Sequence, residues 1–130
     1  IELKGENTAI ETNKVIIEYM NRFNITPSSF IISSFRWDEL VEFRNTNKNV
    51  PIAILVDSLY KIDNAIKLAK EINAFAINPN NKFLTKEIVK KVQSLNLKVY
   101  PYTINDLSSI KRMKSMGVDA MITDFPERIN

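Results

Sequence analysis

The sequence contains no cysteine and no histidine among its 130 residues. The absence of cysteine excludes thiol catalysis, disulfide bonds and cysteine-ligated zinc, and it leaves the redox compartment open. The absence of histidine removes the commonest general base and the commonest metal ligand. Glycine occurs only at Gly5 and Gly117, so the chain holds neither a P-loop nor a GxGxxG dinucleotide motif.

Long hydrophobic runs and linker-like stretches are also missing. No apolar segment approaches the roughly 18 residues that a membrane-spanning helix needs, so no membrane span is expected. The shares of hydrophobic and charged residues, 45% and 25%, are typical of a folded globular domain, and we expect residues 1–130 to form a single domain. The net charge of +3 is small. The lysine clusters follow helical spacing without interleaved aromatic residues, which indicates solvated helix faces and no nucleic-acid partner.

Short apolar runs alternate with longer amphipathic stretches along the whole chain. The short runs lack strict polar alternation, which is typical of parallel strands covered on both faces. The predicted strands are Ile1–Lys4, Phe30–Ser34, Pro51–Val56, Ala74–Ile77, Leu97–Ile104 and Ala120–Thr123. The predicted helices are Thr8–Phe23, Trp37–Arg44, Leu59–Ile72, Lys86–Leu95 and Leu107–Met116.

This alternation predicts an α/β fold of parallel βα repeats with right-handed crossovers. The sheet either is open and doubly wound or forms part of a TIM (β/α)8 barrel. Six predicted strands fall short of eight, and the chain starts inside a strand, at Ile1 and not at a methionine. We therefore favour an incomplete TIM barrel that lacks its first two strands, in a processed product or a piece of a longer chain.

Polar residues at the carboxyl ends of the strands mark the site in both parallel architectures. Glu2 and Lys4 flank Leu3, so the two-residue period of a strand places them on one face, about 6–7 Å apart. If that face lines a barrel, the buried charges need compensation by a metal ion and by an anionic ligand such as a phosphate. The other interpretation is an exposed strand that carries a solvated ion pair.

A second candidate for the site is Tyr102, which lies near the end of a predicted strand. An aromatic ring at that place either forms an apolar wall for a small ligand or packs on the neighbouring helix. Asn105 and Asp106 follow it, and both are also explained as the cap of the next helix.

Four segments stand out by their order and spacing. They are Ile1-Glu2-Leu3-Lys4, Ile31-Ile32-Ser33-Ser34-Phe35, Val99-Tyr100-Pro101-Tyr102-Thr103-Ile104-Asn105 and Gly117-Val118-Asp119-Ala120-Met121-Ile122-Thr123-Asp124-Phe125-Pro126. Together they resemble the C-terminal portion of glycerophosphodiester phosphodiesterases. The resemblance runs over essentially the whole chain, and its most specific part is the last segment, which closes the final barrel strand in that family.

The resemblance implies a phosphodiesterase-type barrel, of which this chain supplies strands three to eight. It implies hydrolysis of glycerophosphodiesters to glycerol 3-phosphate and an alcohol, assisted by a divalent cation, Ca²⁺ or Mg²⁺. By this resemblance Glu2 is one of three carboxylate metal ligands and Lys4 contacts the phosphate. Phe35 and Tyr102 match aromatic residues that border the substrate pocket.

The family's catalytic histidines and its other two metal carboxylates have no counterpart in this sequence. We therefore expect no catalytic residue on this chain, and cation binding that is weak or absent in the chain alone. The alternative function is a catalytically inactive half-barrel that binds a glycerophosphate-like ligand or a protein partner. Because an incomplete barrel leaves open sheet edges, we expect self-association or association with a missing N-terminal segment.

Overall fold

The computed structural model describes residues 1–129, in which five α-helices alternate with four short strands. The helices are α1 (Thr8–Phe23), α2 (Trp37–Thr46), α3 (Ile62–Glu71), α4 (Lys86–Gln93) and α5 (Leu107–Met116). The strands are β1 (Ile32–Ser34), β2 (Ile52–Val56), β3 (Ala76–Pro79) and β4 (Lys98–Val99). None of the helices in this described part of the chain is long and apolar enough to span a membrane.

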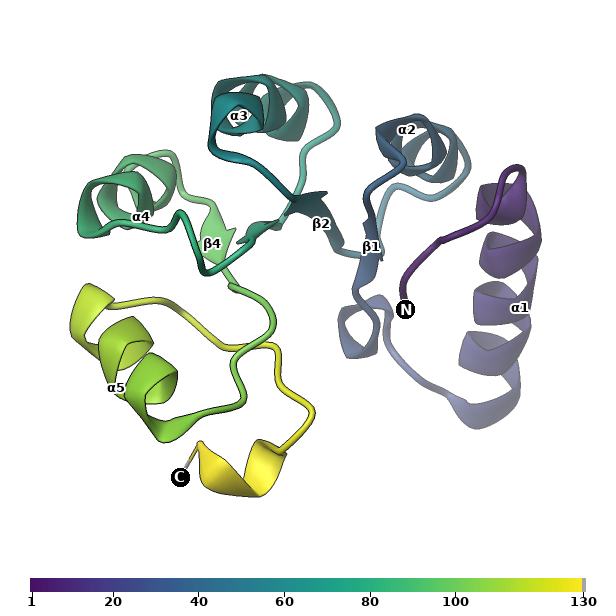
Figure 1. Ribbon diagram of the computed structural model, residues 1–130. Coiled ribbons are helices and arrows are strands. Elements are labelled where there is room, and N and C mark those ends of the chain that lie inside the picture. The colour runs from purple at the N-terminus through teal and green to yellow at the C-terminus, as the bar shows by residue number, and fades with distance from the viewer. Residues whose placement is uncertain (130) are drawn as a thin grey trace.

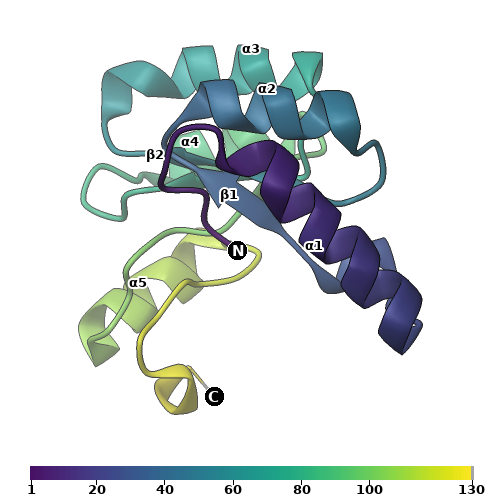
Figure 2. The same cartoon turned by 90° about the vertical axis from the view of Figure 1, so that its right-hand side faces the viewer.

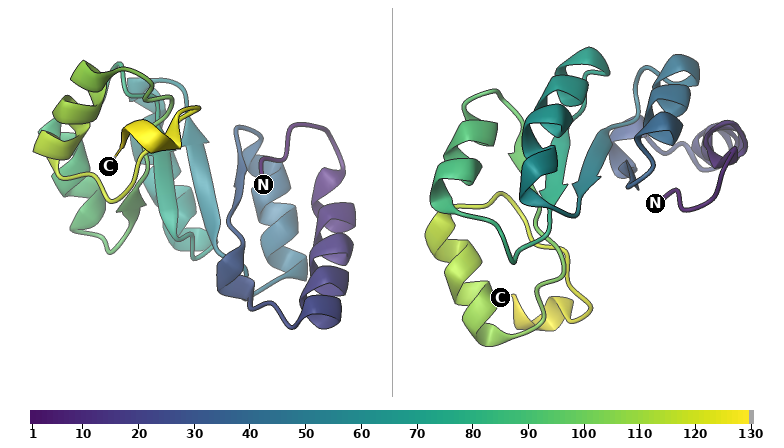
Figure 3. Two further views of the ribbon diagram at one scale, coloured as in Figure 1. Left: turned by 90° about the horizontal axis from the view of Figure 1, so that it is seen from below. Right: turned by 45° about the horizontal axis from the view of Figure 1, so that its top comes forward.

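The strands form one parallel sheet in the order β1-β2-β3-β4, as predicted for consecutive βα repeats. Its register pairs Ile32 with Ile52 and Ile54 with Ile77. The helices lie around one side of the strands as an open arc that begins at α1 and ends at α5 (Figure 1). α2 and α3 cover the sheet together (Figure 2), and α1 and α5 lie at opposite ends of the molecule (Figure 3). Helices on one side only are typical of a partial (β/α) barrel, not of a doubly wound sheet.

Three predicted strands are wrong in extent. Leu97–Ile104 is reduced to β4 (Lys98–Val99) and an isolated pairing of Tyr102 with Asn80. Within Ile1–Lys4 the strand pairing is limited to Glu2 opposite Ser33. Ala120–Thr123 is not a strand, although the Ile122 N–H donates to the Pro101 carbonyl at 2.9 Å. Pro101 has no N–H to return, so a regular ladder cannot continue at that point.

Side chains of the strands alternate between a face that meets the helices and a concave face. Ile52, Ile54 and Val56 are fully buried in the core that the strands share with the helices. Ala53 and Leu55, at the alternate positions, lie on the concave face outside that core. Burying a side chain the size of Ile contributes roughly 1.5–3 kcal/mol, so the layer between sheet and helices provides most of the stability.

A carboxylate from α2 holds the amino end of α1. Glu39 is only 6% exposed, and its Oε1 accepts a hydrogen bond from the Asn7 N–H at 2.6 Å. Its Oε2 accepts from the Thr8 and Ala9 N–H groups at 3.0 and 2.9 Å. The first N–H groups of a helix have no partner within the helix and carry partial positive charge. Glu39 therefore satisfies these donors and compensates its own burial at the same time.

The residues before α1 are fixed against β1. Leu3 is 3% exposed in the core, and its carbonyl accepts a hydrogen bond from the Ser34 hydroxyl at 2.6 Å. The Leu3 N–H donates in turn to the Ser33 carbonyl at 2.8 Å. Because Leu3 points into the core, Glu2 and Lys4 on either side of it point away from the core.

We predict that Glu39→Ala lowers the free energy of unfolding by about 3 kcal/mol, because it leaves three helix N–H groups without their charged acceptor. Urea unfolding followed by circular dichroism measures this change. Glu42→Ala, at an exposed position of the same helix, is the matched control and should stay within about 0.5 kcal/mol of the parent protein. Equal effects of the two substitutions would show that the Glu39 contact contributes little.

Candidate functional site

Polar and aromatic side chains collect at the carboxyl ends of the parallel strands. Glu2 and Lys4 come from the segment that pairs with β1, and Phe35 follows β1 directly. Asp57 follows β2, and Tyr102 lies beyond β4 opposite the end of β3. Because parallel strands end at the same edge of a sheet, this edge is where a ligand is expected.

Glu2 and Lys4 form an accessible ion pair. The Lys4 Nζ lies 3.7 Å from the Glu2 Oε2, and the two side chains are 78% and 35% exposed. A distance of 3.7 Å is too long for a hydrogen bond, so the ammonium keeps its donors available. In the described structure the pair is accessible to solvent, and Lys4 is open to an anionic ligand.

Glu2 alone does not fit a divalent cation. Among residues 1–129 no three carboxylate side chains gather around a common point where a metal ion could be held. Ca²⁺ takes about six to eight oxygen ligands and Mg²⁺ about six, whereas Glu2 offers two oxygens, one of them facing Lys4. Its role as a metal ligand therefore stays a prediction.

Phe35 and Tyr102 meet although their strands are not neighbours in the sheet. Their ring centroids are 5.6 Å apart in an edge-to-face arrangement with an interplanar angle of 85°. The Tyr102 hydroxyl donates to the Val56 carbonyl, at the end of β2, at 2.9 Å. The Tyr102 ring therefore reaches across the carboxyl end of β3. The two rings form an apolar wall above the strand ends, which we call the aromatic wall.

The strand beneath the aromatic wall carries a buried polar group. Asn78 of β3 is 3% exposed, and its Oδ1 is buried without a hydrogen-bond partner among the described residues. It pairs in register with Leu55 on the concave side of the sheet. A buried acceptor without a donor costs about 1–3 kcal/mol, so the Asn78 side chain lowers the free energy of unfolding while it keeps the surface beneath the aromatic wall polar.

The environment of Tyr102 keeps its phenol protonated. Burial raises the pKa of Tyr102, the carboxylates of Asp57 and Glu2 add to this effect because they oppose another negative charge, and together they bring the pKa to about 12. Both carboxylates therefore contribute negative electrostatic potential at the Tyr102 side of the aromatic wall. At neutral pH Tyr102 is a neutral donor, held by its hydrogen bond to Val56.

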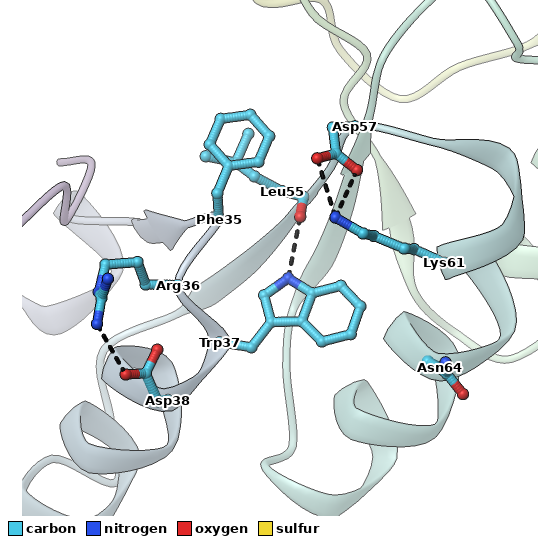
Figure 4. A pocket seen from close by; sticks show the side chains of 8 residues that line it. All are labelled: Phe35, Arg36, Trp37, Asp38, Leu55, Asp57, Lys61 and Asn64. Carbon is cyan, nitrogen blue, oxygen red and sulfur yellow. Dashed lines mark hydrogen bonds and ion pairs between the residues drawn. The ribbon is translucent and has the colours of Figure 1, made fainter.

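A cleft of about 570 Å³ opens beside Phe35, between the loops that follow β1 and β2 (Figure 4). The indole Nε1–H of Trp37 donates to the Leu55 carbonyl at 3.0 Å and fixes the ring against β2. The cleft lining includes Phe35, Trp37, Leu55, Asp57, Lys61 and Asn64. Because Phe35 lines the cleft and also contacts Tyr102, the cleft lies next to the aromatic wall.

The charged groups of the cleft occur in pairs. The Lys61 ammonium lies 2.9 Å from the carboxylate of Asp57, which is four residues earlier in the chain. Hydrogen bonds from Lys61 and then from Ser58 lower the pKa of Asp57, so this carboxylate is ionised at neutral pH. Arg36 contacts Asp38 at 3.2 Å. The cleft therefore has two cations: Lys61 is paired with Asp57, and Arg36 is shared between Asp38 and Glu6, the latter 3.4 Å away.

Sequence reasoning finds part of this edge and misses the rest. The sequence resemblance assigns Phe35 and Tyr102 to one pocket, and in the structure their rings are in contact. It does not single out Trp37, Lys61 or Asn64. The four-residue spacing of Asp57 and Lys61 on either side of a helix start was the available signal.

The residues after Tyr102 are held by structural contacts. The Asp106 side chain caps α5 by accepting from the Ser109 N–H at 2.8 Å, and hydrogen bonds from the Ser108 hydroxyl and then from this N–H lower its pKa. The Asn105 side chain donates to Asp124 at 2.8 Å and accepts from Thr123 at 3.2 Å. The helix-cap interpretation is thereby confirmed for Asp106, whereas Asn105 ties down the C-terminal segment.

The chain matches the glycerophosphoryl diester phosphodiesterase family over residues 2–128. It is 34% identical over 132 residues to the uncharacterized protein YqiK of Bacillus subtilis (strain 168), across 98% of this chain and 53% of that protein. It is 28% identical over 134 residues to the glycerophosphodiester phosphodiesterase of the same organism, across 98% of this chain and 46% of the relative. The chain therefore belongs to this family, as the sequence resemblance predicts, and spans about half the length of these relatives.

Solved structures share the fold. A phosphodiesterase of Oleispira antarctica, in complex with the product sn-glycerol-3-phosphate, matches with a TM-score of 0.81 and 21% identity, across 98% of this chain and 51% of that chain. A glycerophosphodiester phosphodiesterase of Parabacteroides distasonis matches with a TM-score of 0.77 and 22% identity, across 98% and 53% of the two chains. The open arc of βα units is thus a partial barrel of the phosphodiesterase type.

We predict a titration step of Tyr102 near pH 12 that Tyr102→Phe removes. The unfolded chain loses this proton near pH 10, before the folded protein does, so Tyr102 lowers the stability as the pH rises from about 10 towards 12 and leaves it unchanged below that range. Absorbance of tyrosinate in the ultraviolet follows the step. If the step that Tyr102→Phe removes lies near pH 10, the buried environment described for Tyr102 is contradicted.

Proposed function

We propose that this chain carries the phosphate-binding and glycerol-binding part of a glycerophosphodiester phosphodiesterase site. The proposed reaction of the complete site is cation-assisted hydrolysis of a glycerophosphodiester to glycerol 3-phosphate and an alcohol. The observation that carries this proposal is the aromatic wall beside the Glu2–Lys4 pair, in a chain of this family. The product bound to the Oleispira antarctica neighbour supports it.

Different side chains are proposed to contact different parts of the ligand. The exposed ammonium of Lys4 attracts a phosphate oxygen, because a charged donor and a charged acceptor form a strong hydrogen bond. The aromatic wall of Phe35 and Tyr102 offers apolar surface to the glycerol carbons. Glu2 is proposed as one carboxylate towards a divalent cation, and the described residues do not complete that site.

Proton transfer needs groups from outside these residues. Hydrolysis requires a base for the attacking water and an acid for the leaving alcohol, and the chain has no histidine for either. Tyr102 does not replace it as a base, because its raised pKa keeps the phenol protonated at neutral pH, and its hydroxyl already donates to the Val56 carbonyl. We therefore assign binding to this chain and no catalytic residue.

The second candidate function is a catalytically inactive half-barrel that binds a glycerophosphate-like ligand or a protein partner. The absence of histidine favours it. Its proposed partner is a second copy of the chain or an N-terminal barrel segment. Val15, Tyr19 and Phe23 support such association, because they are each about half exposed and their four-residue spacing places them on one face of α1.

We predict that sn-glycerol 3-phosphate binds at the Glu2–Lys4 edge and that Lys4→Ala weakens binding about tenfold, through loss of one charge-assisted hydrogen bond. Isothermal titration calorimetry measures the Kd. Lys14→Ala is the matched control, since Lys14 is an exposed lysine paired with Glu11 on α1, and it should leave the Kd unchanged. Absence of binding, or equal losses in the two variants, would overturn the proposed site.

An assay for release of glycerol 3-phosphate from glycerophosphodiesters separates the two candidate functions. Binding without release by the chain alone is the expected result, and it agrees with the assignment of no catalytic residue. Release that falls in Glu2→Gln would show that the chain itself is a hydrolase and would contradict that assignment.

A further inference from the structure

The position of Tyr102 depends on a segment that has little regular secondary structure. A single isolated pairing, with Asn80, joins Tyr102 to the chain that follows β3. The Tyr102 N–H donates to the Pro79 carbonyl at 3.1 Å, and the hydroxyl donates to the Val56 carbonyl at 2.9 Å. These bonds fix the amino side of the residue and the far end of its side chain. They leave the Tyr102 carbonyl and the next peptide group to be held by other residues.

Asn81, in the loop between β3 and α4, holds the carbonyl side of Tyr102. Its backbone N–H donates to the Tyr102 carbonyl at 3.0 Å, and its Nδ2 donates to the same carbonyl at 3.1 Å. The Nδ2 also donates to the Thr103 carbonyl at 3.3 Å. An amide nitrogen carries two hydrogens, so one side chain can serve both carbonyls. Because Asn81 is half-buried, these hydrogen bonds are partly shielded from competing water.

Arg112 of α5 fixes the orientation of the Asn81 amide. Its Nη2 donates to the Asn81 backbone carbonyl and to the Asn81 Oδ1, each at 2.9 Å. A guanidinium only donates hydrogen bonds, so it selects the oxygen of the amide and turns the nitrogen towards the carbonyls of Tyr102 and Thr103. Both side-chain hydrogen bonds that Arg112 makes within residues 1–129 go to Asn81. Arg112, Asn81 and Tyr102 thus form one chain of contacts from α5 to the aromatic wall.

We propose that Asn81 and Arg112 are positioning residues for the aromatic wall, which keep the Tyr102 ring against Phe35 and so strengthen glycerol 3-phosphate binding without touching the ligand. The two rings are 5.6 Å apart between centroids, so a small movement of the Tyr102 segment would separate them. A ring that is already in place does not have to be immobilised when the ligand binds. This inference rests on the proposed function, since the wall is the surface proposed there for the glycerol carbons.

Asn81→Leu and Arg112→Met test the inference in two measurements at neutral pH. Asn81→Leu keeps the approximate volume of the side chain and removes the amide, whereas Arg112→Met removes the donor that orients the amide. We expect both to weaken binding of sn-glycerol 3-phosphate about fivefold in calorimetry, because the ring must then be immobilised on binding. We also expect both to weaken the nuclear Overhauser contact between the ring protons of Phe35 and Tyr102, which the parent protein should show.

Two further variants of α5 serve as controls. Arg112→Lys keeps a charged donor towards Asn81, so it should recover most of the affinity and of the ring contact that Arg112→Met loses. Lys111→Met removes the same charge from an exposed neighbouring position and should leave both measurements unchanged. If Asn81→Leu fails to fold, the comparison of Arg112→Met with Arg112→Lys decides the matter.

The two measurements separate this inference from the proposed function. Parent-like ring contacts in both Asn81→Leu and Arg112→Met would overturn the positioning role. Loss of the ring contact with parent-like affinity would also overturn it, because the held ring would then add nothing to binding. Absence of glycerol 3-phosphate binding by the parent protein would overturn the proposed function, whereas the ring contacts would still show whether Asn81 and Arg112 hold Tyr102.

Discussion

The contact between the Glu39 carboxylate and the first turn of α1 is the constraint on which the position of the site depends. It links helices that begin about thirty residues apart and removes two unfavourable features at once, a buried charge and unpaired helix donors. With α1 anchored on α2, the residues before it have little freedom, and Leu3 enters the core beside β1. The direction of Glu2 and Lys4 follows from that anchoring. Sequence and packing thus place an exposed ion pair at the carboxyl edge of the sheet.

The site itself is built by side chains that cross the sheet, not by one strand. Tyr102 leaves the end of β4 and is tied to the last carbonyl of β2, and Phe35 meets its ring from β1. This arrangement closes the strand ends with apolar surface on one side and leaves Lys4 open on the other. Asn78 remains buried below without a hydrogen-bond partner for its Oδ1 among the described residues, at a cost in stability. The same wall separates the phosphate-binding edge from the cleft of Trp37.

The local features could be predicted from the sequence, because their signals lie within a few residues. The helical spacing of apolar residues gave α1 and α5 with the bounds that the structure has, and the βα alternation gave the parallel sheet. The resemblance of the four segments to the family brought Phe35 and Tyr102 together. The capping of α1 by Glu39 could not be predicted from the sequence. The N–H groups that donate to Glu39 are about thirty residues away, and its place in α2 has the pattern of an ordinary charged helix residue. The interruption of the ladder beside Ala120–Thr123 could be predicted, because a proline such as Pro101 has no N–H to donate.

Amide chemical shifts of ¹⁵N-labelled protein titrated with sn-glycerol 3-phosphate would locate the ligand at the carboxyl edge of the sheet. We expect the largest shifts on residues 2–4, on the residues next to Phe35 and on the residues next to Tyr102. The amides around Lys98 and Asp119, which form an ion pair at the opposite end of β4, should not move. Shifts concentrated at that opposite end, or no shifts at saturating ligand, would contradict the assignment of the carboxyl edge as the glycerophosphate site.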